Sequence, residues 1–240
     1  MEKSEKELVR IREAYDRRKE SIPAGLYSFF NPSALFLNQQ REKYLIEMLK
    51  GNGFGNLSGM MILDIGCGTG NVLREFMRYG ASPENLYGID LLQDRMDTAV
   101  TISPNIHFQC GNAEKLPYEN NSFDIIILFT VLTSILDSRM KRAIASEALR
   151  TLKPQGIILY YDYLYDNPKN HDVKGVKKSE IKQLFEGSHI ELKRITLAPP
   201  IARVIAPYSW SVCYLLEKLK VFNTHYMGVI RKRVKGLNGK

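Results

Sequence analysis

Three glycines stand at alternate positions, Gly66, Gly68 and Gly70, directly after the apolar run 61–65. Glycine lets the backbone turn tightly and lets a ligand approach it closely. The residues that follow, 71–77, have the apolar spacing of a helix start. A buried strand, a glycine turn and a helix N-terminus together form the nucleotide-binding end of an open α/β sheet.

The spacing of these glycines restricts the kind of nucleotide. The dinucleotide fingerprint G-x-G-x-x-G/A needs glycine or alanine at the position where this chain has Asn71. The pattern therefore disfavours a nicotinamide or flavin cofactor. It favours a nucleoside ligand that has no tightly packed pyrophosphate.

Two polar residues extend this nucleoside site. Asp90 ends the apolar segment 86–90, where a carboxylate would accept hydrogen bonds from both ribose hydroxyls. Alternatively, Asp90 caps the helix that starts near Leu92; with the glycine turn before it, we favour the ribose role. Asn112 follows the segment 106–110, and its amide could pair with an adenine edge or serve a turn.

The elements that must position these residues alternate along the chain. The run 123–129, apolar except for Asp124, is typical of a central strand that is buried on both faces. Strands alternating with helices predict an α/β fold, in which helices cover both faces of a parallel sheet. Strands are expected at 61–65, 86–90, 106–110, 123–129, 157–161, 190–197 and 224–230, and helices at 71–79, 93–101, 138–151 and, capped by Ser179, 179–185.

Two segments lie outside this alternation. Residues 1–57 are expected to form a helical cap, with helices over 1–20 and from about 32 to 49, ahead of a main domain at 58–240. The first of these helices has a thin apolar stripe of Leu8, Ile11 and Tyr15. Residues 198–223 are much longer than a hairpin loop needs, and they carry an apolar helix near 210–219. An insertion of this kind builds a pocket wall or a contact surface.

Taken together, these motifs resemble the class I S-adenosylmethionine-dependent methyltransferases, most closely over residues 58–163. The resemblance rests on the runs 62–70, 112–118, 122–126 and 149–156 and on Asp90. It implies a Rossmann-like seven-stranded sheet with a reversed last strand and S-adenosylmethionine as the cofactor. The residues that it implies for cofactor binding are Asp64, Gly66, Cys67, Gly68, Gly70, Asp90, Leu91, Asn112, Ala113 and Phe129. The family usually has Asp at the position of Asn112, so the adenine contact is altered here.

Some features look like methyltransferases from bacterial surface-glycan or secondary-metabolite gene clusters. They are the tyrosine-rich run 159–168 and the segment around Tyr208 and Trp210. This narrower resemblance favours a sugar or glycan intermediate as the acceptor.

Methyl transfer requires an enzyme to position the acceptor, to exclude water and, for a hydroxyl acceptor, to remove a proton. Asp162 closes a strand and could be the base, orient one or only cap a turn. His171 has a better intrinsic pKa but lies in a loop. Tyr161, with Tyr163 and Tyr165, could line the acceptor pocket or only pack. No Asp/Asn-Pro-Pro-aromatic sequence follows the run 123–129, which disfavours nucleic-acid amino groups as acceptors.

The helical cap contains further candidates. Tyr27, with Phe29 and Phe30, is expected to shield the sulfonium by cation–π contact, or else to staple the second helix to the core. Arg41 could meet the carboxylate of the cofactor or be a solvated charge, and we favour the solvated charge.

The overall charge of the chain is basic, at +8 with a pI of about 9.3. Such a charge permits nucleic acid, an anionic membrane surface or a phosphorylated substrate. The basic clusters 174–178 and 231–235 come without stacking aromatics or a helix-turn-helix pattern, so nucleic acid is not expected. Three scattered cysteines indicate neither disulfides nor a metal site. No signal peptide or membrane-spanning run is visible, and we expect a soluble, cytoplasmic protein.

These observations predict a methyltransferase that acts on a hydroxyl or similar group of a small molecule. A sugar or glycan intermediate, phosphorylated or linked to a nucleotide or a lipid, would suit the basic charge. Two alternatives stay open: a catalytically silent cofactor-binding partner subunit and a nicotinamide-dependent oxidoreductase. The sequence predicts no oligomeric state.

Overall fold

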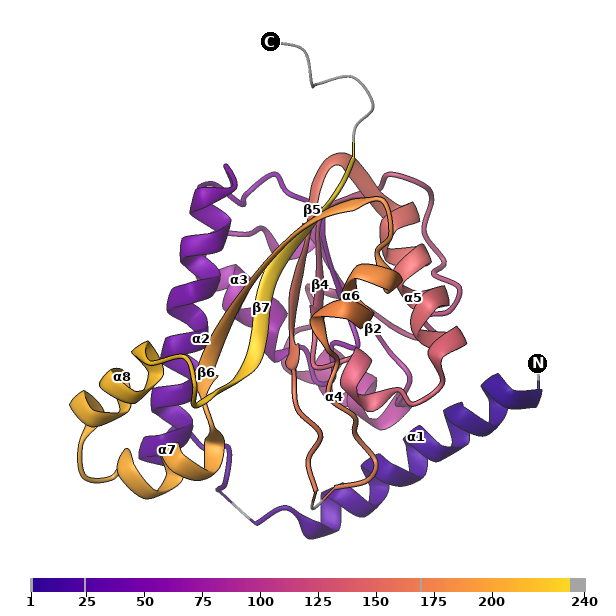
Figure 1. Ribbon diagram of the computed structural model, residues 1–240. Helices are drawn as coiled ribbons and strands as arrows, with labels where there is room; N and C mark the ends of the chain where they lie inside the picture. Colours follow the sequence, from indigo (N-terminus) through magenta and orange to yellow (C-terminus); the bar gives the residue numbers. More distant parts are fainter. Residues whose placement is uncertain (1, 24, 169, 234–240) are drawn as a thin grey trace.

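The computed structural model describes residues 2–23, 25–168 and 170–233, which form helices around one sheet (Figure 1). The strands are β1 (Ile62–Ile65), β2 (Leu86–Asp90), β3 (His107–Cys110), β4 (Phe123–Phe129), β5 (Leu152–Tyr163), β6 (Ser188–Leu197) and β7 (Asn223–Lys232). The α-helices are α1 (Glu2–Ser21), α2 (Pro32–Gly51), α3 (Asn71–Arg78), α4 (Gln93–Ile102), α5 (Ser138–Thr151), α6 (Lys178–Leu184), α7 (Pro199–Ile205) and α8 (Trp210–Lys218). Short 3-10 turns are η1 (Pro83–Asn85) and η2 (Leu132–Ser134).

The sheet has the strand order β3-β2-β1-β4-β5-β7-β6. Strands β1 to β5 pair in parallel, whereas β7 is antiparallel to both of its neighbours, β5 and β6. The expected seven-stranded Rossmann-like sheet with a reversed last strand is therefore confirmed. Because β7 alone is reversed, β6 runs in the same direction as β5 and ends at the same edge of the sheet.

Strand β4 lies in the middle of the sheet, as its hydrophobicity predicted. Ile125 and Ile127 pack into the core on the face covered by α2 and α3. Ile126 and Leu128 pack into the core on the other face, against α5 and α6. Successive side chains of a strand point to opposite faces, so a strand buried on both faces must be apolar throughout. Figure 1 shows the resulting three layers.

Helix α1 lies across the edge where the parallel strands end (Figure 1). Its Glu7 Oε1 accepts the N–H of Leu136 at 2.5 Å, and its Arg10 Nη2 donates to the carbonyl of Ser134 at 2.7 Å. Ser4 donates to Glu114 in the loop after β3. These contacts fix α1 to the loops that follow β3 and β4.

The helical insertion 198–223 connects β6 to β7 and folds as α7 and α8. Its buried contact with the rest of the chain centres on Phe36 of α2, which packs with Leu197, Ala202, Ala206 and Cys213. Since β6 ends beside the carboxyl end of β5, the insertion lies at the same edge of the sheet as α1.

Several expected boundaries differ from the structure. Strand β5 begins at Leu152, five residues before the expected start, because β4 extends its pairing to Leu152 around an irregularity. Ser179 does not cap α6: the N-cap is Lys177, without a side-chain cap bond. The expected basic cluster 231–235 extends beyond Arg233, and Val234 and Lys235 lie outside the described residues.

Two kinds of structural feature are absent from residues 2–23, 25–168 and 170–233. No helix there is long and apolar enough to cross a bilayer. No group of three or more metal-ligating side chains is found in the same ranges.

Candidate functional site

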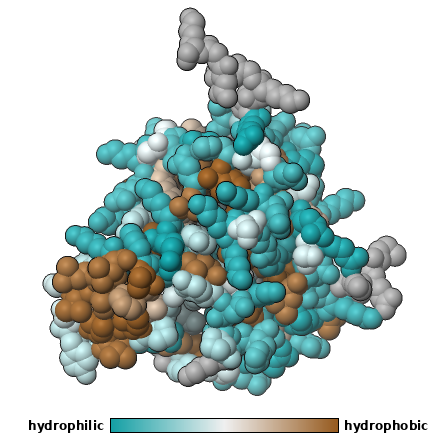
Figure 2. Space-filling model, viewed as in Figure 1, coloured by the Kyte–Doolittle hydropathy of each residue, from teal (hydrophilic) through white to brown (hydrophobic). Residues whose placement is uncertain are grey.

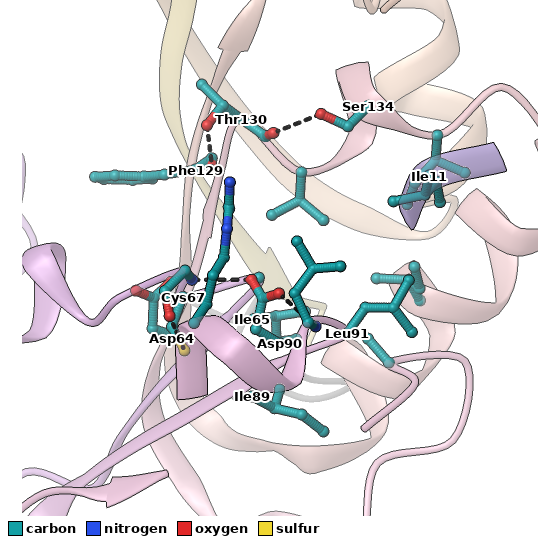
Figure 3. Close-up of a pocket in the computed structure, with 18 of the residues that line it drawn as sticks. Ile11, Asp64, Ile65, Cys67, Ile89, Asp90, Leu91, Phe129, Thr130 and Ser134 are labelled. Atoms are coloured by element: carbon teal, nitrogen blue, oxygen red, sulfur yellow. Dashed lines mark hydrogen bonds between the residues drawn. The ribbon is translucent and has the colours of Figure 1, made fainter. Parts of the chain in front are cut away.

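A cavity of about 480 Å³ lies where the parallel strands end, within the range of about 300–1,000 Å³ that is typical of small-molecule sites. Loops after β1, β2, β3 and β4 form its floor and sides, and α1 closes it with Leu8, Ile11 and Tyr15. Figure 3 shows Phe129 and Thr130 above Asp64 and Asp90, with Ile11 approaching from one side. Most of the residues expected to bind the cofactor line it: Asp64, Gly66, Cys67, Gly68, Asp90, Leu91, Asn112, Ala113 and Phe129.

Asp90 joins two of these loops. Its Oδ2 accepts the N–H of Gly68 at 2.9 Å, and its Oδ1 accepts the N–H of Leu92 at 3.0 Å. The bond to Leu92 is the capping role given as the alternative; the carboxylate also borders the cavity, and its ribose role stays a prediction. Gly66 and Gly68 both have positive φ values, 72° and 56°, which glycine adopts without strain.

Gly70 does not line the cavity but starts α3 with a φ of 80°. A Cβ at this position would lie 2.6 Å from the ring of Phe108. Its place in the motif is thus explained by the backbone turn and by packing, rather than by contact with a ligand.

Three charged side chains meet at one end of the cavity. Arg41 Nη2 forms an ion pair of 2.5 Å with Glu75 Oε1. Among the described residues, Arg41 Nε, Glu75 Oε2 and Asp64 Oδ2 are buried without a hydrogen-bond partner. Burial holds the pKa of Asp64 well above its ordinary value, and the nearby carboxylates of Asp90 and Glu75 raise it further. Asp64 and Arg41 both line the cavity, so this end of it suits a ligand that carries an ammonium and a carboxylate group.

Arg41 is therefore not the solvated charge that we favoured. Its side chain is 17% exposed and lines the cavity, because α2 packs against the sheet and turns this residue toward the ends of the strands. A guanidinium that is shielded from water and not fully paired can bind an anionic group.

Asn112 lines the cavity, but its side chain is already engaged. Its Oδ1 accepts the N–H of Glu114, and its Nδ2 donates to Glu114 Oε2, both at 2.9 Å. This is the turn that we gave as the alternative to an adenine contact. Leu91 and Ala113 add apolar surface nearby.

The ends of β4 and β5 form the opposite wall. The rings of Phe129 and Tyr161 meet edge to face at 5.6 Å, and the hydroxyl of Tyr161 lies 3.0 Å from Thr196 Oγ1. Burial raises the pKa of Tyr161 above its ordinary value. Thr130 has a φ of 56°, an unusual conformation for a β-branched residue, and it borders the cavity.

The other two catalytic candidates lie away from the cavity. Asp162 is 1% exposed; its Oδ2 accepts the N–H of Thr133 at 3.0 Å and its Oδ1 that of Tyr163 at 2.9 Å. Burial raises its pKa to about 7. It therefore fixes the turn after β4 rather than facing a ligand. His171 is exposed on the loop after β5 and does not line the cavity.

Tyr27 also lies outside this cavity and is 58% exposed. It borders an adjoining hollow, which is lined by Tyr15, Arg18, Lys19, Ile22, Pro23, Gly25, Leu26, Tyr27, Ser28, Arg95 and Thr130. The hollow shares Tyr15, Arg95 and Thr130 with the cavity, so the two adjoin at these side chains. Its charged lining residues are Arg18, Arg95 and Lys19, and Lys19 is ion-paired with Asp16 and Asp94.

Arg95 and Tyr15 were missed as site residues by sequence reasoning. The guanidinium of Arg95 lies 4.3 Å from the centre of the Tyr15 ring, a cation–π contact that joins α4 to α1. The apolar stripe of α1 was visible in the sequence, but its target was not. Nothing near Arg95 indicated its role.

Comparison with known proteins agrees with this geometry. A family model described as a methyltransferase domain matches residues 62–156. A ubiquinone biosynthesis O-methyltransferase of Rickettsia bellii is 30% identical over 179 residues, which are 66% of this chain and 72% of that protein. The tRNA N(3)-cytidine methyltransferase METTL2 of Bos taurus is 32% identical over 136 residues; the match covers 52% of this chain but only 36% of that protein.

Solved structures share the fold at low sequence identity. A geranyl diphosphate C-methyltransferase from Streptomyces coelicolor has a TM-score of 0.59 at 15% identity, over 82% of this chain and 77% of that one. An S-adenosylmethionine-dependent methyltransferase from Mesorhizobium loti has a TM-score of 0.56 at 19% identity, over 76% of this chain and 95% of that one. The sequence matches support S-adenosylmethionine, rather than a nicotinamide, as the cofactor. The chain belongs to the class I S-adenosylmethionine-dependent methyltransferases.

Proposed function

We propose that this methyltransferase acts in the cytoplasm on a hydroxyl of a small molecule that carries an anionic group. A sugar or glycan intermediate that is phosphorylated, or linked to a nucleotide or a lipid, has this chemistry. The observation that carries the proposal is the hollow beside the cavity, which we call the acceptor hollow: Arg18 and Arg95 line it together with the ion-paired Lys19, and it adjoins the cavity. An anionic group held by Arg18 and Arg95 would leave the rest of the acceptor pointing toward Thr130.

In this proposal the cavity holds the cofactor through residues whose chemistry fits its parts. Asp90 accepts the ribose hydroxyls, and Leu91 and Ala113 flank the adenine ring beside Asn112. Arg41 binds the carboxylate of the methionine part, and Asp64 accepts from its ammonium group. S-adenosylmethionine supplies a methyl group that its sulfonium already activates for displacement.

The protein itself has to exclude water and align the acceptor. Leu8 and Ile11 cover the cavity from α1, and Phe129 covers it from β4. We propose that α1 acts as a lid and that Tyr161 bounds the path of the acceptor. Asp162 is a positioning residue in this scheme, because it holds Thr133 and with it the turn after β4.

A second acceptor class, a phenolic hydroxyl, is favoured by one further observation. The described lining of the acceptor hollow contains no carboxylate and no imidazole that could take a proton. A phenol ionises more easily than a sugar hydroxyl and depends less on a base. The name of the related ubiquinone biosynthesis O-methyltransferase is consistent with this class.

The test is methyl transfer from labelled S-adenosylmethionine by the purified chain. The panel contains sugar phosphates, nucleotide sugars, lipid-linked glycans, phenols with and without an anionic group, and tRNA. We expect a labelled product from at least one anionic hydroxyl compound, and a lower kcat/KM for it in Arg95→Gln. Arg142→Gln, an exposed arginine on α5, is the matched control.

Two results would overturn the proposal. Labelled tRNA without any labelled small molecule would assign the site to nucleic acid. Calorimetric binding of S-adenosylmethionine with no labelled product from any compound would favour a catalytically silent partner subunit.

A further inference from the structure

We propose that the helical insertion 198–223, together with the loop 27–30, is a docking face for an anionic membrane surface. We call these two segments the docking face. Docking rests on the exposed side chains of this face alone. Only its consequence, delivery of a membrane-held acceptor to the active site, rests on the proposed function.

The docking face exposes many large apolar side chains. Figure 2 shows them gathered over α7 and α8. The most exposed are Val204, Tyr208, Leu215, Leu219 and Val221, between 63% and 89%, and Phe30 in the loop, at 99%. Single exposed apolar residues are ordinary, but a contiguous group of them marks an interaction surface. Aliphatic and aromatic side chains together are typical of helices that lie in a membrane interface.

The exposed charges of the insertion are all positive. Arg203, Lys218 and Lys220 are exposed. Its one carboxylate, Glu217, is 2% exposed and accepts the N–H of Thr196 at 3.2 Å. Cations around an apolar face complement the negative surface of a bilayer. In a symmetric pair of copies the same cations would face one another without a carboxylate of the insertion to offset them, so a second copy of the chain is the weaker fit.

The docking face is continuous with the mouth of the acceptor hollow. Phe30 and Arg203 line one shallow depression, together with Pro207. The chain just before Phe30, from Gly25 to Ser28, lines the acceptor hollow itself. The reversal of β7 produces this arrangement, because it puts the insertion at the edge of the sheet where the cavity opens. A molecule anchored in the membrane would therefore reach the hollow without leaving the bilayer surface.

The chain carries its own probe of docking. Trp210, the only tryptophan in the sequence, begins α8 within the insertion. The full-length chain is mixed with vesicles of phosphatidylcholine, or with vesicles that also contain about one third phosphatidylglycerol. We expect anionic vesicles to shift the emission of Trp210 to shorter wavelength, and brominated acyl chains to quench it. Neutral vesicles should have much less effect, and added salt should weaken the response.

Vesicle flotation then tests the two parts of the face. The apolar variant is Val204→Ser/Leu215→Ser/Leu219→Ser, and the charge variant is Arg203→Gln/Lys218→Gln/Lys220→Gln. Each should lower the partition onto anionic vesicles about tenfold or more. The matched controls change exposed residues elsewhere, Val9→Ser/Val100→Ser/Ile102→Ser and Arg142→Gln/Lys177→Gln/Lys182→Gln, and should partition like the wild type.

Three outcomes would overturn the proposal. The first is an unchanged Trp210 emission with anionic vesicles. The second is that the variants float as well as the wild type while still binding S-adenosylmethionine normally. If a triple variant does not bind S-adenosylmethionine normally, Leu215→Ser alone takes its place. The third is self-association in the absence of vesicles that the apolar variant abolishes, which would assign the face to a second copy. Flotation without methyl transfer to any acceptor would leave docking intact and refute only the proposed function.

Discussion

The carboxylate of Asp90 accepts the backbone N–H of Gly68 at 2.9 Å and thereby ties the glycine turn after β1 to the end of β2. One side chain thus shapes the turn and borders the cavity. We expect Asp90→Asn to weaken S-adenosylmethionine binding about tenfold or more, because an amide has only one acceptor oxygen and its NH2 group would face one of the two backbone N–H groups that now donate to Asp90. Isothermal titration calorimetry measures the change. Asp97→Asn, an exposed carboxylate on α4, should bind like the wild type, and equal losses in both variants would contradict the assignment.

Arg41 should distinguish the cofactor from an analogue that lacks its carboxylate. We expect the wild type to bind S-adenosylmethionine about tenfold more tightly than decarboxylated S-adenosylmethionine, because charge-assisted hydrogen bonds are strong when shielded from water. In Arg41→Gln this ratio should fall toward one. Calorimetry with both ligands gives the ratio, and Arg78→Gln, whose 65% exposed side chain pairs with Glu42, is the control. An equal loss of affinity for both ligands would mean that Arg41 only supports the fold.

Gly70 and Gly80 form a matched pair for stability. Both have positive φ values, 80° and 94°, but a Cβ at Gly70 would lie 2.6 Å from the Phe108 ring, whereas a Cβ at Gly80 would meet nothing within 4 Å. We expect Gly80→Ala to lower the free energy of unfolding by about 1 kcal/mol, from backbone strain alone. Gly70→Ala should lower it by about 2 kcal/mol more, because the ring must move. Urea denaturation measures both; similar losses would show that Phe108 yields without cost.

Asp162 should make stability depend on pH. Its pKa in the folded protein is about 7 and its ordinary value is 3.8, so between these values the folded state holds a proton that the unfolded state has lost. The free energy of unfolding should therefore fall as pH rises from about 4 to about 7, with a slope of at most about 1.4 kcal/mol per pH unit. Asp162→Asn has no carboxyl group to titrate at this position. Its free energy of unfolding minus that of the wild type should therefore rise from pH 4 to pH 7 and then level off.

His225 has the opposite effect on the pH dependence of stability. This effect cancels when the wild type is compared with Asp162→Asn. Burial lowers its pKa to about 3, so its contribution to stability grows as pH rises from about 3 to 6.5. Both proteins contain His225, and the difference between their urea-unfolding curves isolates Asp162. A difference that stays constant from pH 5 to 8 would show that Asp162 does not hold a proton in the folded state.

The sheet and the glycine turn were predictable because their signals are local. Ile125 to Leu128 are apolar without interruption, and a strand buried on both faces needs that pattern. Asp90 was identified as a site residue because strand length and direction fix where a strand ends. Short segments of this kind were enough to predict the fold class and S-adenosylmethionine as the cofactor.

The residues missed or misplaced depend on contacts between distant segments. Arg95 meets Tyr15 across 80 positions of the chain, and no local pattern announces a contact of that kind. Arg41 looked like a surface charge because its burial depends on how α2 lies on the sheet. Tyr27 has a side chain suited to a cofactor pocket, but the turn before α2 leaves it outside the cavity. Residue type shows what chemistry is available, whereas tertiary packing decides which groups meet.

The reversal of β7 also bears on how this enzyme could diversify. The insertion leaves the sheet after Leu197 and returns at Asn223, and these two residues pair directly with each other. The pairing of β6 with β7 therefore continues up to both ends of the insertion, whatever the length of the insertion. A different segment could be grafted between them, provided that it covers Phe36, while the cofactor cradle on β1 and β2 stays untouched. The fold thereby lets the segment between β6 and β7 change without altering the strand ends that form the cavity, whose described lining includes no residue of 198–223.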